Sequence, residues 1–173
     1  MRVFKSDWVV QKVGPDGVNF SDFSAVIPMF VTEVECVMKS SGGFGAKQMA
    51  GSTFVAMYFV AVRGQQQQHE PLISKFQSCL ETYASQDVQK LVVNKPADVD
   101  FDLGAYFGGE DKFQYSFVFT ITLDGENSID RVREAQKHFE EECFSQLNLP
   151  ATWIACGERA VVLDQVSNIK VSI

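Results

Sequence analysis

The alternation of apolar and polar residues changes period along the chain, and its first third has the pattern of β-strands. Residues 30–39 alternate in period two, as in a strand with one buried and one wet face. Residues 54–63 are aromatic, β-branched and apolar on both faces, which predicts a central strand. Another strand is expected over residues 3–13, before a Gly-Pro-Asp-Gly turn at 14–17, and the glycine-rich stretch 40–51 predicts a loop.

Two later segments have the helical period. The first begins at His69 with Pro71 in its first turn, and its apolar stripe consists of Leu72, Ile73, Phe76, Cys79, Leu80 and Tyr83. The second begins after a cap at Asn127 or Ser128 and ends before Pro150, and its stripe consists of Ile129, Val132, Gln136, Phe139, Cys143 and Leu147.

A long strand is predicted between these helices, over residues 113–123, where apolar and polar residues alternate strictly. Residues 91–93 either continue the first helix or begin a short strand before Pro96. After the second helix the pattern predicts a turn at Gly157-Glu158 and three short strands, at 151–156, 160–163 and 166–173.

The resulting order of elements, βββ-α-β-α-ββ, predicts a single α+β domain over residues 1–173. We expect a mixed or mainly antiparallel sheet of five or six strands, with both amphipathic helices packed on one face. A doubly wound parallel sheet would need strict alternation of strands and helices, which this pattern lacks. The polar sides of the strands leave the other face of the sheet to water or to a partner.

Charge narrows the functions that such a domain can serve. The chain has 15 Lys and Arg against 22 Asp and Glu, a net charge of −7. No overall field attracts nucleic acid or an anionic membrane, so direct nucleic-acid binding is disfavoured. Residues 64–173 carry nine basic and seventeen acidic residues, whereas residues 1–63 carry six and five. The acidic half is either a solvated surface or a surface for a basic partner.

The sequence also predicts a compartment. No basic start followed by an apolar run resembles a secretory signal, and the longest apolar run, residues 54–62, is far shorter than the roughly 20 residues of a membrane-spanning helix. Cys36, Cys79, Cys143 and Cys156 have no C-x-x-C spacing, so we expect free, buried thiols. These features predict a cytoplasmic protein, of its own or a host cell, without a membrane partner.

Two motifs resemble ligand sites but fit them poorly. Asp98, Asp100 and Asp102 alternate as in a calcium loop. The twelfth position of that loop is Gly109 instead of glutamate, so a solvated acidic loop is the better interpretation. Residues 42–47 contain glycines and a lysine but lack the G-x-x-x-x-G-K-[ST] spacing of a phosphate loop. We therefore predict neither a metal site nor a cofactor.

Few residues offer a route to catalysis. His138 and Cys143 are five residues apart on a predicted helix and point about 140° apart, so they cannot form a dyad. His69, at a helix entry, is expected to be a cap or a surface residue. The glutamates at 140–142 oppose the dipole at the end of the second helix, which is either a small local cost or the mark of a partner.

Fifteen phenylalanines are the main compositional anomaly, and several fall in predicted loops. A loop aromatic side chain either folds back on the core or enters a groove of a neighbour. The C-terminal segment alternates apolar residues to its end, and it pairs either within its own sheet or with the sheet of a neighbour. The predicted interface residues are Phe20, Phe23, Phe44, Phe101, Phe107, Ile169, Val171 and Ile173.

These observations favour a non-enzymatic structural or assembly subunit that self-associates, as a homo-oligomer or within a larger assembly. Small α+β subunits build rings and shells, including those of virus and phage particles, a link by fold analogy alone. The alternative is an acidic binding or inhibitor protein that engages a basic partner surface. A third hypothesis is a small enzyme whose cleft gathers residues distant in sequence, Asp102, Glu110 or His69 with Cys36.

Overall fold

The computed structural model describes residues 11, 29–36, 53–63, 69–97 and 115–159. Within these ranges the chain forms five strands and two α-helices. In chain order they are β1 (Val31–Cys36), β2 (Thr53–Val60), α2 (His69–Tyr83), β3 (Val88–Pro96), β4 (Phe117–Leu123), α4 (Ile129–Glu142) and β5 (Trp153–Arg159). Short 3-10 turns precede α4 and β5, at Glu126–Ser128 and Leu149–Ala151.

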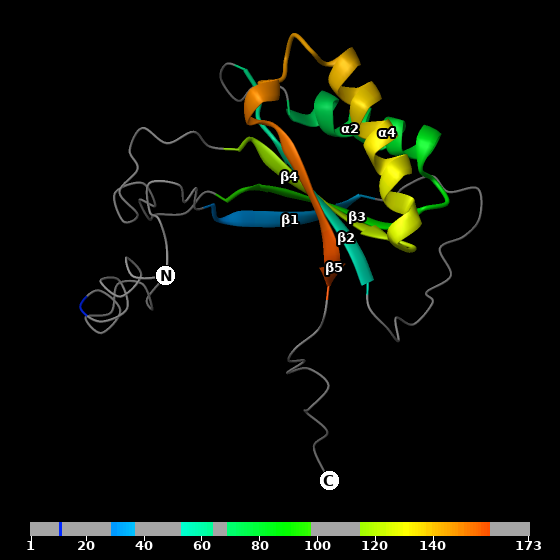
Figure 1. Ribbon diagram of the computed structural model, residues 1–173. Coiled ribbons are helices and arrows are strands. Elements are labelled where there is room, and N and C mark those ends of the chain that lie inside the picture. Colours follow the sequence, from blue (N-terminus) through cyan, green and yellow to red (C-terminus); the bar gives the residue numbers. More distant parts are fainter. Residues whose placement is uncertain (1–10, 12–28, 37–52, 64–68, 98–114, 160–173) are drawn as a thin grey trace.

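The five strands form one antiparallel sheet with the order β1-β3-β4-β2-β5 (Figure 1). From β2 to β5 the main elements follow the βαββαβ pattern of a ferredoxin-like unit, and β1 adds a fifth strand beside β3. β2 lies between β4 and β5, so the prediction of a central strand over residues 54–63 is confirmed. The predicted α+β class is confirmed as well.

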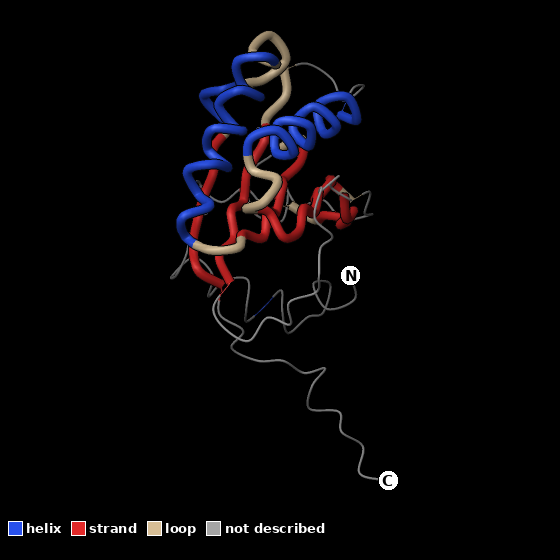
Figure 2. The backbone as a smooth tube through the Cα atoms, turned by 90° about the vertical axis from the view of Figure 1, so that its right-hand side faces the viewer, coloured by secondary structure: helices blue, strands red, loops and turns tan. Residues whose placement is uncertain are grey.

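Both helices cover the same face of the sheet (Figure 2). Their apolar stripes pack on the side chains of the central strands, and Tyr58 of β2 lies at the middle of this core with no exposed surface. Its ring centroid is 5.1 Å from that of Phe76 on α2 and 6.2 Å from that of Phe139 on α4. Burying an aromatic side chain of this kind contributes roughly 1.5–3 kcal/mol from apolar area.

In the described ranges, neither helix is long and apolar enough to cross a membrane.

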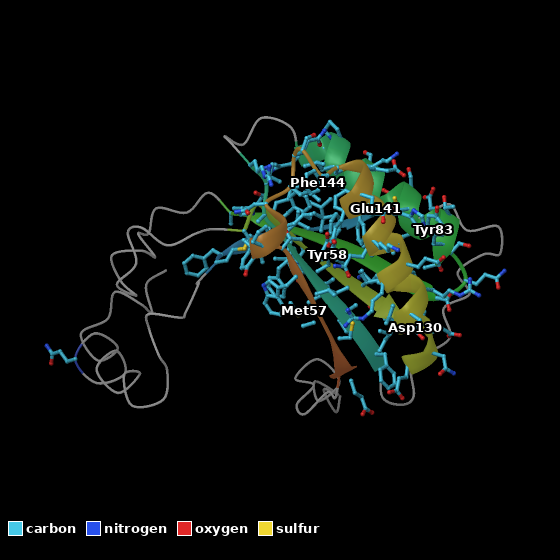
Figure 3. The ribbon with its side chains drawn as sticks, turned by 45° about the horizontal axis from the view of Figure 1, so that its top comes forward. Met57, Tyr58, Tyr83, Asp130, Glu141 and Phe144 are labelled. Atoms are coloured by element: carbon cyan, nitrogen blue, oxygen red, sulfur yellow. The ribbon has the colours of Figure 1, made fainter. Side chains whose placement is uncertain are left out.

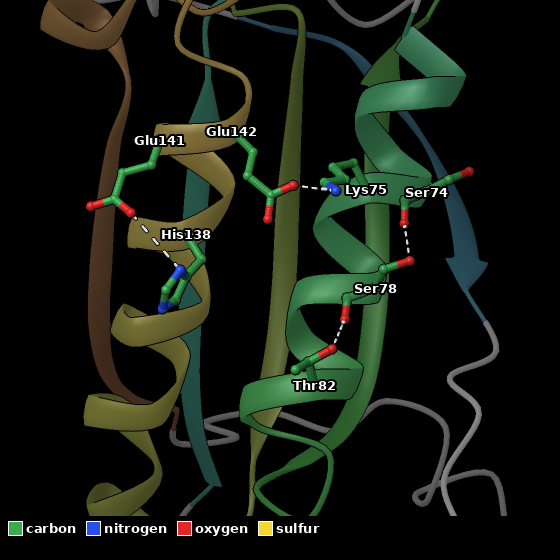
Figure 4. Close-up of polar contacts among 7 residues, drawn as sticks. All are labelled: Ser74, Lys75, Ser78, Thr82, His138, Glu141 and Glu142. Carbon is green, nitrogen blue, oxygen red and sulfur yellow. Dashed lines mark hydrogen bonds and ion pairs between the residues drawn. The ribbon is translucent and has the colours of Figure 1, made fainter.

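Polar contacts link α2 to α4 on their solvent side. The Lys75 ammonium forms an ion pair with the Glu142 carboxylate (Figure 4). The rings of Tyr83 and His138 stack with centroids 4.2 Å apart and planes 3° apart. Along α2, the Thr82 hydroxyl donates to the Ser78 carbonyl at 2.8 Å, as Figure 4 shows. The two helices therefore form one layer.

The structure corrects the predicted order of elements. Residues 91–93 belong to the separate strand β3, so the order over the described residues is ββαββαβ. β3 pairs with β1 on one side and β4 on the other, and residues 91–94 are all buried. A strand covered on both faces has no period-two alternation, which is why this segment was ambiguous in sequence.

The predicted turn at Gly157-Glu158 is wrong. Both residues lie within β5, where they pair with Val55 and Phe54 of β2. β5 is an edge strand that pairs with β2, and Gly157 is exposed on it. An edge position tolerates a glycine that sequence rules assign to a turn.

The second helix is shorter than its apolar stripe predicted. α4 ends at Glu142, and Leu147 is buried outside it, where it forms an isolated bridge with Val62. Ala135 fills the stripe, whereas Gln136 is only half-buried. The chain turns back after the helix. Leu147 is therefore buried in the core from the segment after α4 and not from the helix itself.

The side chains of β1 are more exposed to solvent than the sequence predicted. Val31 is 41% exposed and Val34 is 42% exposed, although they lie on opposite faces of β1. Among the described strands, β1 is the other edge of the sheet and pairs with β3. The strand predicted from residue 113 begins at Phe117. Several predicted segments lie outside the described residues, Gln11 excepted: the strands at 3–13, 160–163 and 166–173, the turn at 14–17, the loop at 40–51 and the acidic loop of Asp98, Asp100 and Asp102.

Candidate functional site

The face of the sheet that points away from the helices forms the candidate site. On this face the strand register places residues of β5, β2 and β4 side by side in three rows. We name these rows the outward grid. The first row is Trp153, Phe59 and Val118, the second is Ala155, Met57 and Thr120, and the third is Gly157, Val55 and Thr122.

Alternation along β2 separates the grid from the core. Tyr58 points toward the helices and is fully buried, whereas its neighbour Met57 is 40% exposed on the opposite side (Figure 3). Val55 and Phe59, two residues before and after Met57, are half-buried. The two described helices cover one apolar face of this strand, and Met57 is exposed on the other.

An aromatic cluster holds the first row in place. The rings of Phe59 and Trp153 stack with centroids 4.3 Å apart and planes 7° apart. The Trp153 indole Nε1 donates a hydrogen bond to the Tyr115 hydroxyl at 2.6 Å, and the Tyr115 ring lies 5.2 Å from that of Phe59. Trp153 is still 46% exposed. It is therefore an exposed aromatic side chain with a fixed orientation.

The third row differs from the first in the size of its side chain on β5. Along β5 the outward side chains shrink from an indole at Trp153, through a methyl group at Ala155, to none at Gly157, and all three residues are exposed. A Cβ atom added at Gly157 would meet no other atom within 4 Å. The space above Gly157 is open, so the grid has a raised row and a low row.

The outward grid contains no charged residue, although the chain has a net charge of −7. Charged residues lie on the same face farther from β5, where the register places Glu33 on β1 and Lys90 on β3. The centres of protein interfaces are depleted in charge and enriched in aromatic residues and methionine. The grid thus has the chemistry of an interaction surface.

The interface residues predicted from sequence all lie outside the described ranges, so the structure does not bring them together. They are Phe20, Phe23, Phe44, Phe101, Phe107, Ile169, Val171 and Ile173. The sequence analysis missed the grid itself. One signal could have found part of it, because a strand that is apolar on both faces keeps an apolar face after helices cover one side. That signal was present in residues 54–63.

The acidic end of α4 is used within the chain. Glu140 Oε1 accepts hydrogen bonds from the Tyr58 hydroxyl at 2.9 Å and from Gln136 Nε2 at 2.7 Å. Glu141 lies 3.8 Å from His138 Nδ1, and Glu142 pairs with Lys75. Each carboxylate has a partner that explains its position, so this segment does not require a second molecule.

Of the residues in the enzyme hypothesis, the structure describes His69 and Cys36, which share Lys95 and Glu70 as charged neighbours. His69 begins α2 with its ring 5.5 Å from that of Phe117, and its buried Nε2 has no hydrogen-bond partner within the described part of the chain. Burial and the nearby Lys95 ammonium lower the pKa of His69. The Cys36 thiol donates a weak hydrogen bond to the Val34 carbonyl oxygen, with Sγ 4.0 Å from that oxygen.

Asp102 and Glu110 lie outside the described residues. Burial raises the pKa of all four thiols, of which Cys79 and Cys143 are buried in the core as predicted. Among the described residues, no group of three or more His, Cys, Asp or Glu side chains could hold a metal ion.

Comparison with known proteins gives one distant likeness to report. No protein-family model matches the chain, and no curated protein matches it. Among solved structures, the chain is similar to a dimeric ferredoxin-like protein of unknown function from Thermobifida fusca YX. The identity is 12% over 66% of this chain and 96% of that chain, with a TM-score of 0.38.

Proposed function

We propose that the protein is a non-enzymatic structural or assembly subunit that acts by associating with further copies of itself. The observation that carries this proposal is the outward grid, whose nine residues include no charged one and in which Met57 and Trp153 are 40% and 46% exposed. The exposed residues of the grid lie on β5 and β2, whereas Val118 of β4 is buried. Exposed apolar surface of this kind marks protein interaction sites. Trp153 is the type of side chain that most often dominates interface energetics.

Charge supports the same face as the point of contact. Two chains that each carry −7 repel one another over most orientations. Contact through the grid buries no carboxylate, so it avoids the desolvation cost of an unpaired charge. Salt screens the remaining repulsion, so self-association strengthens as ionic strength rises. An acidic inhibitor bound to a basic partner would show the opposite salt dependence.

Solution mass tests the proposal. Light scattering is measured after size-exclusion chromatography over a range of protein and salt concentrations. The wild type is expected to form a defined oligomer, and Met57→Lys, which places a charge in the middle of the grid, is expected to be monomeric. The matched control is Phe144→Ser, because Phe144 is 59% exposed but follows α4 outside the grid. A wild type that stays monomeric under all conditions contradicts the proposal.

The same measurement tests the finer proposal that the subunit builds a ring or a shell, such as that of a viral particle. A two-fold contact alone closes at a dimer, so a ring or shell needs a second, heterologous contact. A closed oligomer larger than a dimer supports this extension. A dimer that does not grow with concentration contradicts the ring or shell and leaves self-association in place.

A further inference from the structure

We infer that two copies of the chain pack their outward grids against each other about a two-fold axis that runs across the strands, along the second row. This inference rests on the proposed self-association and names its surface, its partner and its geometry. The axis passes over Ala155, Met57 and Thr120, which the register places in one line. The partner is the same grid on a second copy.

The geometry follows from the antiparallel register. A two-fold axis in this direction turns the sheet over and reverses its strands, so each strand lies over its own copy in the opposite direction. This is the aligned packing of two sheets, whose faces lie about 10 Å apart. Residues of the second row then face their own copies. Residues of the first row face those of the third row.

The two outer rows are complementary in size. Trp153 is placed over Gly157 of the second copy, and Phe59 is placed over Val55 of the second copy. The symmetry repeats both contacts. The open space above Gly157, where an added Cβ meets nothing within 4 Å, is where the second indole lies. An axis parallel to the strands above β2 would instead set Trp153 against Val118 and Gly157 against Thr122 of the second copy. The indole would then have no low position opposite it, and the space above Gly157 would be filled less well, which forfeits dispersion contacts.

Trp153 is prepared for this role before association. Its indole is already oriented by the Phe59 ring and by the hydrogen bond from Nε1 to Tyr115. Fixing an exposed side chain normally costs conformational entropy on binding, and a side chain held in advance avoids most of that cost. On the axis, the flexible thioether of Met57 adapts to its own copy.

Gly157→Leu separates this geometry from a general loss of the fold. A leucine at 157 fills the space that receives the second indole, so we expect the dissociation constant to rise about tenfold or more. The fold itself should keep or gain thermal stability, because glycine weakens a strand interior and the added side chain meets no atom of its own chain. Glu158→Leu is the matched control, since it adds the same side chain to the helix side of β5. Trp153→Ala should weaken association as well.

Cross-linking tests the position of the axis. Ala155→Cys places a thiol on the axis, facing its own copy, and a short bismaleimide should join the two chains efficiently. Gly157→Cys places the thiols on opposite sides of the axis, so the same reagent should join them poorly. Wild-type protein serves as the blank for the native cysteines, which are free thiols. Equal cross-linking at 155 and 157 would overturn the proposed axis.

The outcomes separate this inference from the proposed function. A wild type that is monomeric at every concentration overturns both. A wild type that forms an oligomer, in which Gly157→Leu and Trp153→Ala associate as strongly as wild type, overturns only the grid-to-grid geometry. Weakened association of both variants with unchanged Glu158→Leu supports it.

Discussion

The hydroxyl of Tyr58, at the centre of the sheet, donates a hydrogen bond to the Glu140 carboxylate of α4 at 2.9 Å. Tyr58 is fully buried, and Glu140 lies half-buried at the helix surface, where it also accepts from Gln136. Burial and the adjacent carboxylate raise the pKa of Tyr58 far above its ordinary value. One polar contact thus joins the sheet to the helix layer through the aromatic core.

Tyr58→Phe should destabilise the fold by about 1.5–3 kcal/mol, because the lost hydrogen bond is to a charged group. For a domain of this size, each kcal/mol lowers the melting temperature by roughly 2–4 °C. Urea denaturation of the wild type and the variant measures the difference. Tyr83→Phe is the control, since Tyr83 is only half-buried and its ring stacks on His138. Equal losses for the two variants would contradict this account.

The same hydroxyl predicts an alkaline limit to stability. The folded pKa of Tyr58 lies above the unfolded value of about 10, so its contribution is complete below that pH and is lost as the pH rises beyond it. The free energy of unfolding should therefore fall above about pH 10, and less steeply in Tyr58→Phe. In absorbance titration, one of the four tyrosines should ionise only on unfolding.

His69 predicts an acid dependence of the opposite sign. Its folded pKa is lowered, first by burial and then by Lys95, so the unfolded chain takes up the proton first as the pH falls. The free energy of unfolding should decrease as the pH drops below about 6.5. Denaturant titrations at a series of pH values should show a shallower decrease for His69→Gln. Glu70→Gln should show a steeper one, because the Glu70 carboxylate raises the His69 pKa.

The thiols should react slowly in the native protein. Burial raises the pKa of all four cysteines, and the thiolate is the reactive form. Reaction with an aromatic disulfide reagent at neutral pH should be slowest at Cys79 and Cys143, which are 5% exposed, and faster at the half-buried Cys36 and Cys156. Peptide mapping assigns the order. A core cysteine that reacts as fast as it does in denaturant would show that the α2–α4 core opens readily.

Long segments with one clear period were predictable from sequence. The stripe from Leu72 to Tyr83 has a single helical face and gave α2 at its observed start, His69. β2 was predicted as central because both of its faces are apolar. Gly157 was assigned to a turn because the pattern alone does not reveal that β5 continues through it as an edge strand.

The candidate site depends on strand order, which periodicity does not encode. Phe59 and Trp153 stack because β5 returns to pair with β2, and nothing local to either residue indicates that pairing. The Tyr115 contact depends on where β4 begins. The loop phenylalanines expected at an interface were chosen by composition, whereas the grid arises from side chains of three strands that meet only after folding.

The position of β2 has a consequence for how the chain folds during synthesis. Both of its neighbours in the sheet, β4 and β5, are made later than β2 itself, so its two edges stay unpaired until the chain has emerged as far as Leu123 and then Arg159. Unpaired, apolar strand edges are the parts of a nascent chain most prone to aggregation. α2 follows at once and brings Phe76 within 5.1 Å of Tyr58. An early β2–α2 contact would shield one side of this strand while the ribosome is still completing the rest.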